Sequence, residues 1–117
     1  MAVTKSILII DDEDLILNLL TQAFSLNGYK VFTAKNGIDG LRTFRKERAD
    51  IVLTDIKMPD LSGYELITHI RKESPHTKVA LMTGGDDEIV SDLIKEGKAD
   101  HFFQKPFNLS YLCKTLS

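Results

Sequence analysis

Short apolar runs alternate along the chain with segments in which apolar residues recur every three or four positions. The first run, Ile7–Ile10, is a continuous apolar tetrad with β-branched residues at three of its four positions. Such a run is typical of a strand buried on both faces. Similar runs predict four further strands, at residues 29–34, 51–54, 79–82 and 101–104.

The segments that follow these runs have the spacing of amphipathic helices. The first helix is predicted to end at Asn27-Gly28, because glycine commonly terminates a helix. Gly40 lies inside the second predicted helix and is expected to weaken it locally. The residues predicted to face the core are, helix by helix, Ile16, Leu19, Leu20, Ala23 and Phe24; Ile38, Leu41 and Phe44; Leu66, Ile67 and Ile70; Ile89, Leu93 and Ile94; and Leu109, Leu112 and Leu116.

The strict alternation of strand and helix predicts an α/β fold. Alternating units of this kind form a parallel sheet with helices on both faces. Ligands of such sheets bind at the carboxyl ends of the strands, near the point where the strand order reverses. The residues that follow the predicted strands are therefore the first candidates for a functional site.

Acidic, hydroxyl and ammonium groups stand at four of these strand ends, namely Asp11 with Asp12, Asp55, Thr83 and Lys105. Three ionised carboxylates so close together would repel each other, and a hard divalent cation such as Mg²⁺ would remove the repulsion. Asp55 is then either a metal ligand or a nucleophile toward a phosphoryl group. Lys105 and Thr83 would supply a positive charge and a hydroxyl donor to that group.

Each of these residues also has a purely structural explanation. An aspartate pair before a helix is often an N-cap, Asp55 could be a turn residue, and Thr83–Gly85 could be a glycine turn. Lys105 could be a solvated loop lysine. Their joint occurrence at equivalent strand ends favours a single site.

Composition narrows the function classes. The chain has 117 residues, enough for one domain, and 15 basic against 17 acidic side chains give a net charge of −2. Nucleic-acid contact is therefore not expected, and the apolar runs are too short for a membrane span. Cys113 is the only cysteine, which excludes an internal disulfide and fits a cytoplasmic location.

The motifs together resemble the receiver domain of two-component response regulators, of the chemotaxis-regulator type. The matching segments are Ile7–Glu13, Leu53–Pro59, Leu81–Gly84 and Phe102–Phe107, which occur in the family's order and extend over nearly the whole chain. The resemblance implies one receiver domain over residues 1–117. It also implies a three-layer flavodoxin-like (βα)5 fold with a five-stranded parallel sheet of order 2-1-3-4-5.

The resemblance implies a phosphoacceptor site. Asp55 would accept a phosphoryl group from a phosphohistidine on a histidine kinase or phosphotransfer protein. Asp12, Asp55 and the backbone carbonyl of Lys57 would bind Mg²⁺ (or Mn²⁺) directly. Asp11 would hold a metal-bound water.

A conformational switch is implied as well. Lys105 would pair with the phosphoryl oxygens, Thr83 would move toward them, and Phe102 would swing into the vacated space. The surface formed by the fourth helix, fifth strand and last helix would then change, controlling an output domain or partner and allowing a weak or phosphorylation-dependent dimer. Phe102 as a static core residue is the alternative. The peptide bond before Pro106 would be cis.

Three positions depart from the common pattern. Lys57, two residues after Asp55, and Gly85, two after Thr83, occupy positions that tune phosphoryl lifetime in the family. We expect Lys57 to contact the phosphoryl group or an acidic neighbour. Lys98 stands where a glycine is common, so the turn there is expected to differ.

A phosphorylation-driven switch, not an enzyme beyond its own phosphoryl transfer and autodephosphorylation, is the leading interpretation. A phosphatase with an aspartyl intermediate would need an acidic or polar partner where Lys57 stands. A flavin or dinucleotide binder would have its phosphate repelled by residues 11–14. A receiver that only docks proteins is a further alternative. The chain is expected to be a piece of a longer regulator or hybrid kinase, or else a stand-alone receiver.

Overall fold

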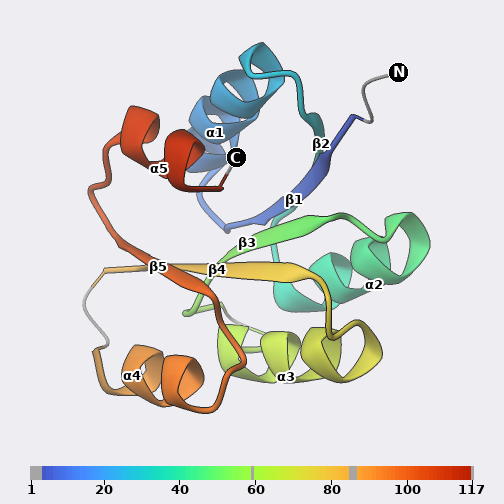
Figure 1. Cartoon of the computed structure of the whole chain (residues 1–117), viewed down its shortest axis with the longest axis vertical. Helices are drawn as coiled ribbons and strands as arrows, with labels where there is room; N and C mark the ends of the chain where they lie inside the picture. The colour runs from blue at the N-terminus through green and yellow to red at the C-terminus, as the bar shows by residue number, and fades with distance from the viewer. Residues whose placement is uncertain (1–3, 59, 85–86, 117) are drawn as a thin grey trace.

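Five parallel strands and five helices alternate along the chain in a computed structural model that describes residues 4–58, 60–84 and 87–116 (Figure 1). The side chains of residues 87–89 are also outside this description. The elements are β1 (Ser6–Ile10), α1 (Asp14–Leu26), β2 (Lys30–Ala34), α2 (Gly37–Glu47), β3 (Ile51–Asp55), α3 (Gly63–Glu73), β4 (Lys78–Thr83), α4 (Asp87–Lys95), β5 (His101–Gln104) and α5 (Leu109–Leu116).

The strands pair in the order β2-β1-β3-β4-β5. All four pairings are parallel, so the predicted fold class and strand order are confirmed. Ile10 is in register with Thr54, and Asp55 with Met82. The carboxyl ends of β1, β3 and β4 therefore lie next to one another at one edge of the sheet.

Helices cover both faces of the sheet, with α1 and α5 on one side and α2, α3 and α4 on the other (Figure 1). Alternate residues of β1 enter the two cores: Ile7 and Ile9 pack with the α1–α5 side, and Leu8 and Ile10 with the other. All four are completely buried. Each such side chain contributes about 1.5–3 kcal/mol of hydrophobic stabilisation.

Most of the predicted helix faces are buried or half-buried, but three residues assigned to the core are exposed. Leu19 is 42% exposed, Ile38 52% and Ile94 45%, so the prediction is wrong at these positions. Each lies at the margin of its helix's apolar stripe, which is wider than the part that the sheet covers. The side chain of Ile89 lies outside the described residues.

Two glycines explain local features of the helices. A Cβ atom on Gly40 would lie 2.5 Å from Ile10 Cδ1, so the glycine lets α2 approach β1 closely. Gly97 has φ of +71° in the turn after α4, a backbone conformation that favours glycine. Gly97 therefore carries the left-handed conformation of this turn, and the departure expected at Lys98 stays a prediction. Among the described residues there is no helix with the length and apolar character that crossing a bilayer requires.

Candidate functional site

Three aspartates meet at the carboxyl edge of the sheet. Asp11 and Asp12 directly follow β1, and Asp55 is the last residue of the neighbouring strand β3. One carboxylate oxygen of each lies within 4.8 Å of the others. Asp11 is completely buried and Asp55 is 9% exposed, whereas Asp12 is exposed. The structure thus brings together the acidic residues that the sequence singled out.

Lys105 approaches this group from the far side of β4, since it directly follows β5. Its Nζ donates hydrogen bonds to Asp11 Oδ2 at 2.8 Å and to Asp55 Oδ2 at 3.0 Å. Glu13 Oε1 lies 3.6 Å from the same nitrogen. The ammonium group therefore joins the two buried carboxylates, and Glu13, for which the sequence had suggested no role, lies at the margin of the network.

Backbone N–H groups also donate hydrogen bonds to the two buried carboxylates. The N–H of Glu13 donates to Asp11 Oδ1 at 2.9 Å, and the N–H of Lys57 donates to Asp55 Oδ1 at 3.3 Å. Each carboxylate thus receives one backbone N–H on one oxygen and the ammonium of Lys105 on the other. These contacts fix the orientation of both carboxylates in the folded protein.

The remaining predicted residues lie around this network. Thr83 is buried at the end of β4, which lies between β3, the strand that ends at Asp55, and β5, the strand that Lys105 follows. Phe102 is half-buried on β5 and packs against the core on the α2–α4 side. The peptide bond between Lys105 and Pro106 is cis. Gly85 lies outside the described residues.

Burial and charge shift the pKa values of the site in a coupled way. Burial raises the pKa of Asp11, and this effect exceeds the lowering by the hydrogen bonds from Lys105 and the Glu13 N–H. For Lys105, burial favours the neutral amine, but the hydrogen bonds to Asp11 and Asp55 outweigh it and raise its pKa above the usual value. The lysine is therefore firmly protonated and serves as the counter-charge of the aspartates.

The raised pKa of Asp11 predicts a pH dependence of folding stability. The Asp11 carboxyl binds its proton more tightly in the folded protein than in the unfolded protein. Its contribution to the unfolding free energy therefore falls as the pH rises from about 3.8, the ordinary pKa, through the raised pKa of the folded protein, and is constant above it. We expect the unfolding free energy of wild type minus that of Asp11→Asn to fall over this interval. Urea titrations without divalent metal would measure this difference in unfolding free energy. They would run from pH 3.5 to 7, about the range over which carboxyl groups of folded proteins titrate. A difference that rises with pH would contradict the assignment.

The donor set fits a hard divalent cation. Three carboxylates contribute oxygen atoms, the ligand type that Mg²⁺ and Mn²⁺ prefer, and the single ammonium of Lys105 does not neutralise them. In the part of the chain that the structure describes, Asp11, Asp12 and Asp55 form the only such cluster of His, Cys, Asp or Glu side chains. A cation held here would complete the charge balance.

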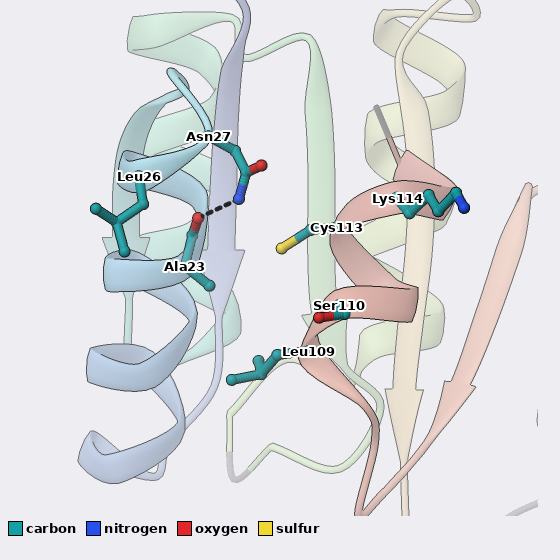
Figure 2. A pocket seen from close by; sticks show the side chains of 7 residues that line it. All are labelled: Ala23, Leu26, Asn27, Leu109, Ser110, Cys113 and Lys114. Carbon is teal, nitrogen blue, oxygen red and sulfur yellow. Dashed lines mark hydrogen bonds between the residues drawn. The ribbon is translucent and has the colours of Figure 1, made fainter.

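A groove between α1 and α5 lies apart from this site (Figure 2). It is lined by Ala23, Leu26, Asn27, Leu109, Ser110, Cys113 and Lys114. Ala23 and Leu26 lie in the last turns of α1, at the opposite end of the helix from Asp14, which is close in sequence to the aspartates of the site. Burial raises the pKa of the Cys113 thiol. None of the predicted site residues lines the groove, so the candidate site remains the carboxyl edge of the sheet.

Comparisons with known proteins agree with this geometry. Residues 7–117 match the family model of the response regulator receiver domain. Sporulation initiation phosphotransferase F of Bacillus subtilis is 35% identical over 106 residues, which cover 90% of this chain and 85% of that protein. The crystal structure of a CheY-like receiver domain protein from Methanospirillum hungatei has a TM-score of 0.92 and 32% identity, over 97% of this chain and 91% of that one.

Other relatives are much longer than this chain. The regulatory protein AtoC of Escherichia coli is 35% identical over 96% of this chain, which spans only 24% of AtoC. The match to the transcriptional regulatory protein PhoP of B. subtilis, at 33% identity over 89% of this chain, spans 43% of PhoP. The family match covers nearly the whole chain, and the strand order is the one expected for a receiver domain. The chain therefore belongs to the response regulator receiver domain family.

Proposed function

We propose that this domain is a phosphorylation-dependent switch in which Asp55 accepts a phosphoryl group from a phosphohistidine. The donor would be a histidine kinase or a phosphotransfer protein. The observation that carries the proposal is the hydrogen-bonded group of Asp11, Asp55 and Lys105, with Asp12 beside it, at the carboxyl edge of the sheet. Membership of the receiver family supports the same class of function.

The transfer itself is a single displacement at phosphorus. A carboxylate oxygen of Asp55 forms the new P–O bond while the P–N bond to the donor imidazole breaks, and the electron pair of that bond stays with the imidazole. Asp12, Asp55 and the backbone carbonyl of Lys57 would hold Mg²⁺ or Mn²⁺, which neutralises phosphoryl oxygens when bound. Asp11 would act from the outer shell of that site.

The protein's own groups would stabilise the transferred phosphoryl group. The Nζ of Lys105 lies 3.0 Å from Asp55 Oδ2, so its charge is available to oxygens attached to Asp55. Thr83, at the end of the neighbouring strand β4, would supply a hydroxyl donor. The ammonium of Lys105 is already held beside Asp55 by the fold, so it needs little rearrangement during transfer.

The switch would reach partners through the surface of α4, β5 and α5. A phosphoryl group adds negative charge and strong acceptor oxygens, so it favours the conformation in which Thr83 and Lys105 contact it. Thr83 would move toward the phosphoryl group, and Phe102, now half-buried, would move inward. The altered surface would regulate an output domain of a longer chain, a separate partner or a weak dimer, and the cytoplasm is the location we propose.

Intact-mass measurement with a small acyl phosphate tests the proposal. With Mg²⁺, the wild-type protein should gain the mass of one phosphoryl group, and hydroxylamine should remove it, because the product is an acyl phosphate. With a chelator in place of Mg²⁺, the gain should be nearly lost. The absence of any adduct would refute the proposal and favour a docking-only receiver, whereas repeated release of phosphate from phosphomonoesters would indicate a phosphatase.

A further inference from the structure

Asp60 binds the first residues of a helix to which it does not belong. It lies in the loop between β3 and α3, and its Oδ1 accepts the backbone N–H of Gly37 at 3.0 Å, while Oδ2 accepts that of Ile38 at 3.1 Å. Oδ1 also accepts the N–H of Leu61 at 2.7 Å. Because Gly37 begins α2, one carboxylate joins the loop after Asp55 to the start of this helix.

Helix capping alone does not account for this contact. α2 already has its own N-cap, since the side chain of Asn36 accepts the N–H of Asp39. Asp60 instead bonds to N–H groups at the positive end of the helix dipole. Asp60 is exposed, and although some loss of solvation acts to raise its pKa, the hydrogen bonds from the backbone N–H groups outweigh this effect and lower the pKa. The carboxylate is therefore charged at neutral pH, and its hydrogen bonds are charge-assisted.

Close backbone packing also holds the loop between β3 and α3, both against α2 and between its own two ends. A Cβ atom on Gly37 would lie 2.3 Å from the carbonyl oxygen of Leu61, so only glycine permits this approach. The two ends of the loop are also joined, because the N–H of Gly63 donates to the carbonyl of Ile56 at 2.8 Å. A Cβ on Gly63 would lie 2.7 Å from the carbonyl oxygen of Asp55. The loop between these contacts carries Lys57.

We propose that Asp60 is a positioning residue for the phosphoacceptor site. By holding the loop against α2, it keeps Lys57 where its N–H reaches Asp55 Oδ1 at 3.3 Å. The same placement would fix the backbone carbonyl of Lys57 for the divalent cation. This inference rests on the proposed function, because it assigns the loop a role in metal binding and phosphoryl transfer.

Two substitutions and a matched control test the inference. Asp60→Ala removes all three hydrogen bonds, and Asp60→Asn keeps one acceptor oxygen, so it remains informative if the alanine variant folds poorly. Asp39→Ala is the control. Asp39 is also an acidic residue in the first turn of α2, but its side chain bonds to Asn36 and Arg42. Mn²⁺ affinity is measured from the paramagnetic resonance of the free ion, alongside acyl-phosphate labelling rates and urea midpoints.

We expect Asp60→Ala to bind Mn²⁺ about tenfold more weakly than wild type, as is common when an outer-shell partner is lost. Asp60→Asn should fall between the two, and Asp39→Ala should bind Mn²⁺ as wild type does, even if its urea midpoint falls. Unchanged Mn²⁺ affinity in Asp60→Ala, or an equal loss in Asp39→Ala, would overturn the inference alone. A wild-type protein that takes no phosphoryl group would instead refute the proposed function and this inference with it.

Discussion

Replacing Asp55 with asparagine is expected to abolish the gain of a phosphoryl group from acyl phosphate, even at high Mg²⁺. Asparagine has nearly the same shape and keeps an oxygen that can accept the N–H of Lys57, which donates to Asp55 Oδ1 at 3.3 Å. It lacks the anionic oxygen that attacks phosphorus. Intact mass after a timed incubation is the measurement, and we expect labelling below detection in the variant.

The stability of the Asp55→Asn protein separates lost chemistry from lost structure. The substitution removes a hydrogen bond from Lys105 but also relieves repulsion from Asp11 and Asp12, so the unfolding free energy should change by no more than about 1 kcal/mol. Asp14→Asn is a matched control, since Asp14 is an exposed aspartate paired with Lys35 at 2.6 Å. The control should label like wild type. Labelling of Asp55→Asn at the wild-type rate would show that another residue is the acceptor.

The sheet and the position of the site were predictable because both follow from short-range patterns. The tetrad Ile7–Ile10 has no polar residue on either face, and such a strand needs helices on both sides. Once the strands are parallel, the residue after each strand is placed at one edge of the sheet. Asp11, Asp12, Asp55 and Lys105 could therefore be grouped before their contacts were known, and the structure brings them together.

The features that the sequence did not reveal depend on contacts between distant elements. Leu19, Ile38 and Ile94 have the spacing of core residues, but their exposure depends on how much of each helix the sheet covers. The contact of Asp60 with α2 spans 22 and 23 residues and uses backbone N–H groups. Every residue except proline carries such a group, so no sequence pattern marks this contact.

Lys105→Met is expected to change stability and metal affinity in opposite directions. In the metal-free protein, Lys105 is the cation shared by Asp11 and Asp55, at 2.8 and 3.0 Å. Methionine fills similar volume but leaves two buried carboxylates uncompensated, which should lower the unfolding free energy in a chelator by about 3 kcal/mol. Because the variant has no ammonium to repel a divalent cation, Mg²⁺ affinity should rise, by about tenfold on Coulombic grounds.

Three measurements on one variant make this prediction specific. Urea unfolding with and without Mg²⁺ should show that the metal restores much of the lost stability, since it binds only the folded site. Calorimetric titration gives the affinity, and labelling by acyl phosphate at saturating Mg²⁺ should be slower by about a hundredfold, as when one transition-state donor is removed. Lys35→Met, at an exposed ion pair, is the control and should match wild type in metal affinity and labelling. If Lys105→Met instead bound Mg²⁺ more weakly than wild type, the prediction would be wrong. The Lys105 ammonium would then support metal binding, and would not simply neutralise Asp11 and Asp55 in the metal-free protein.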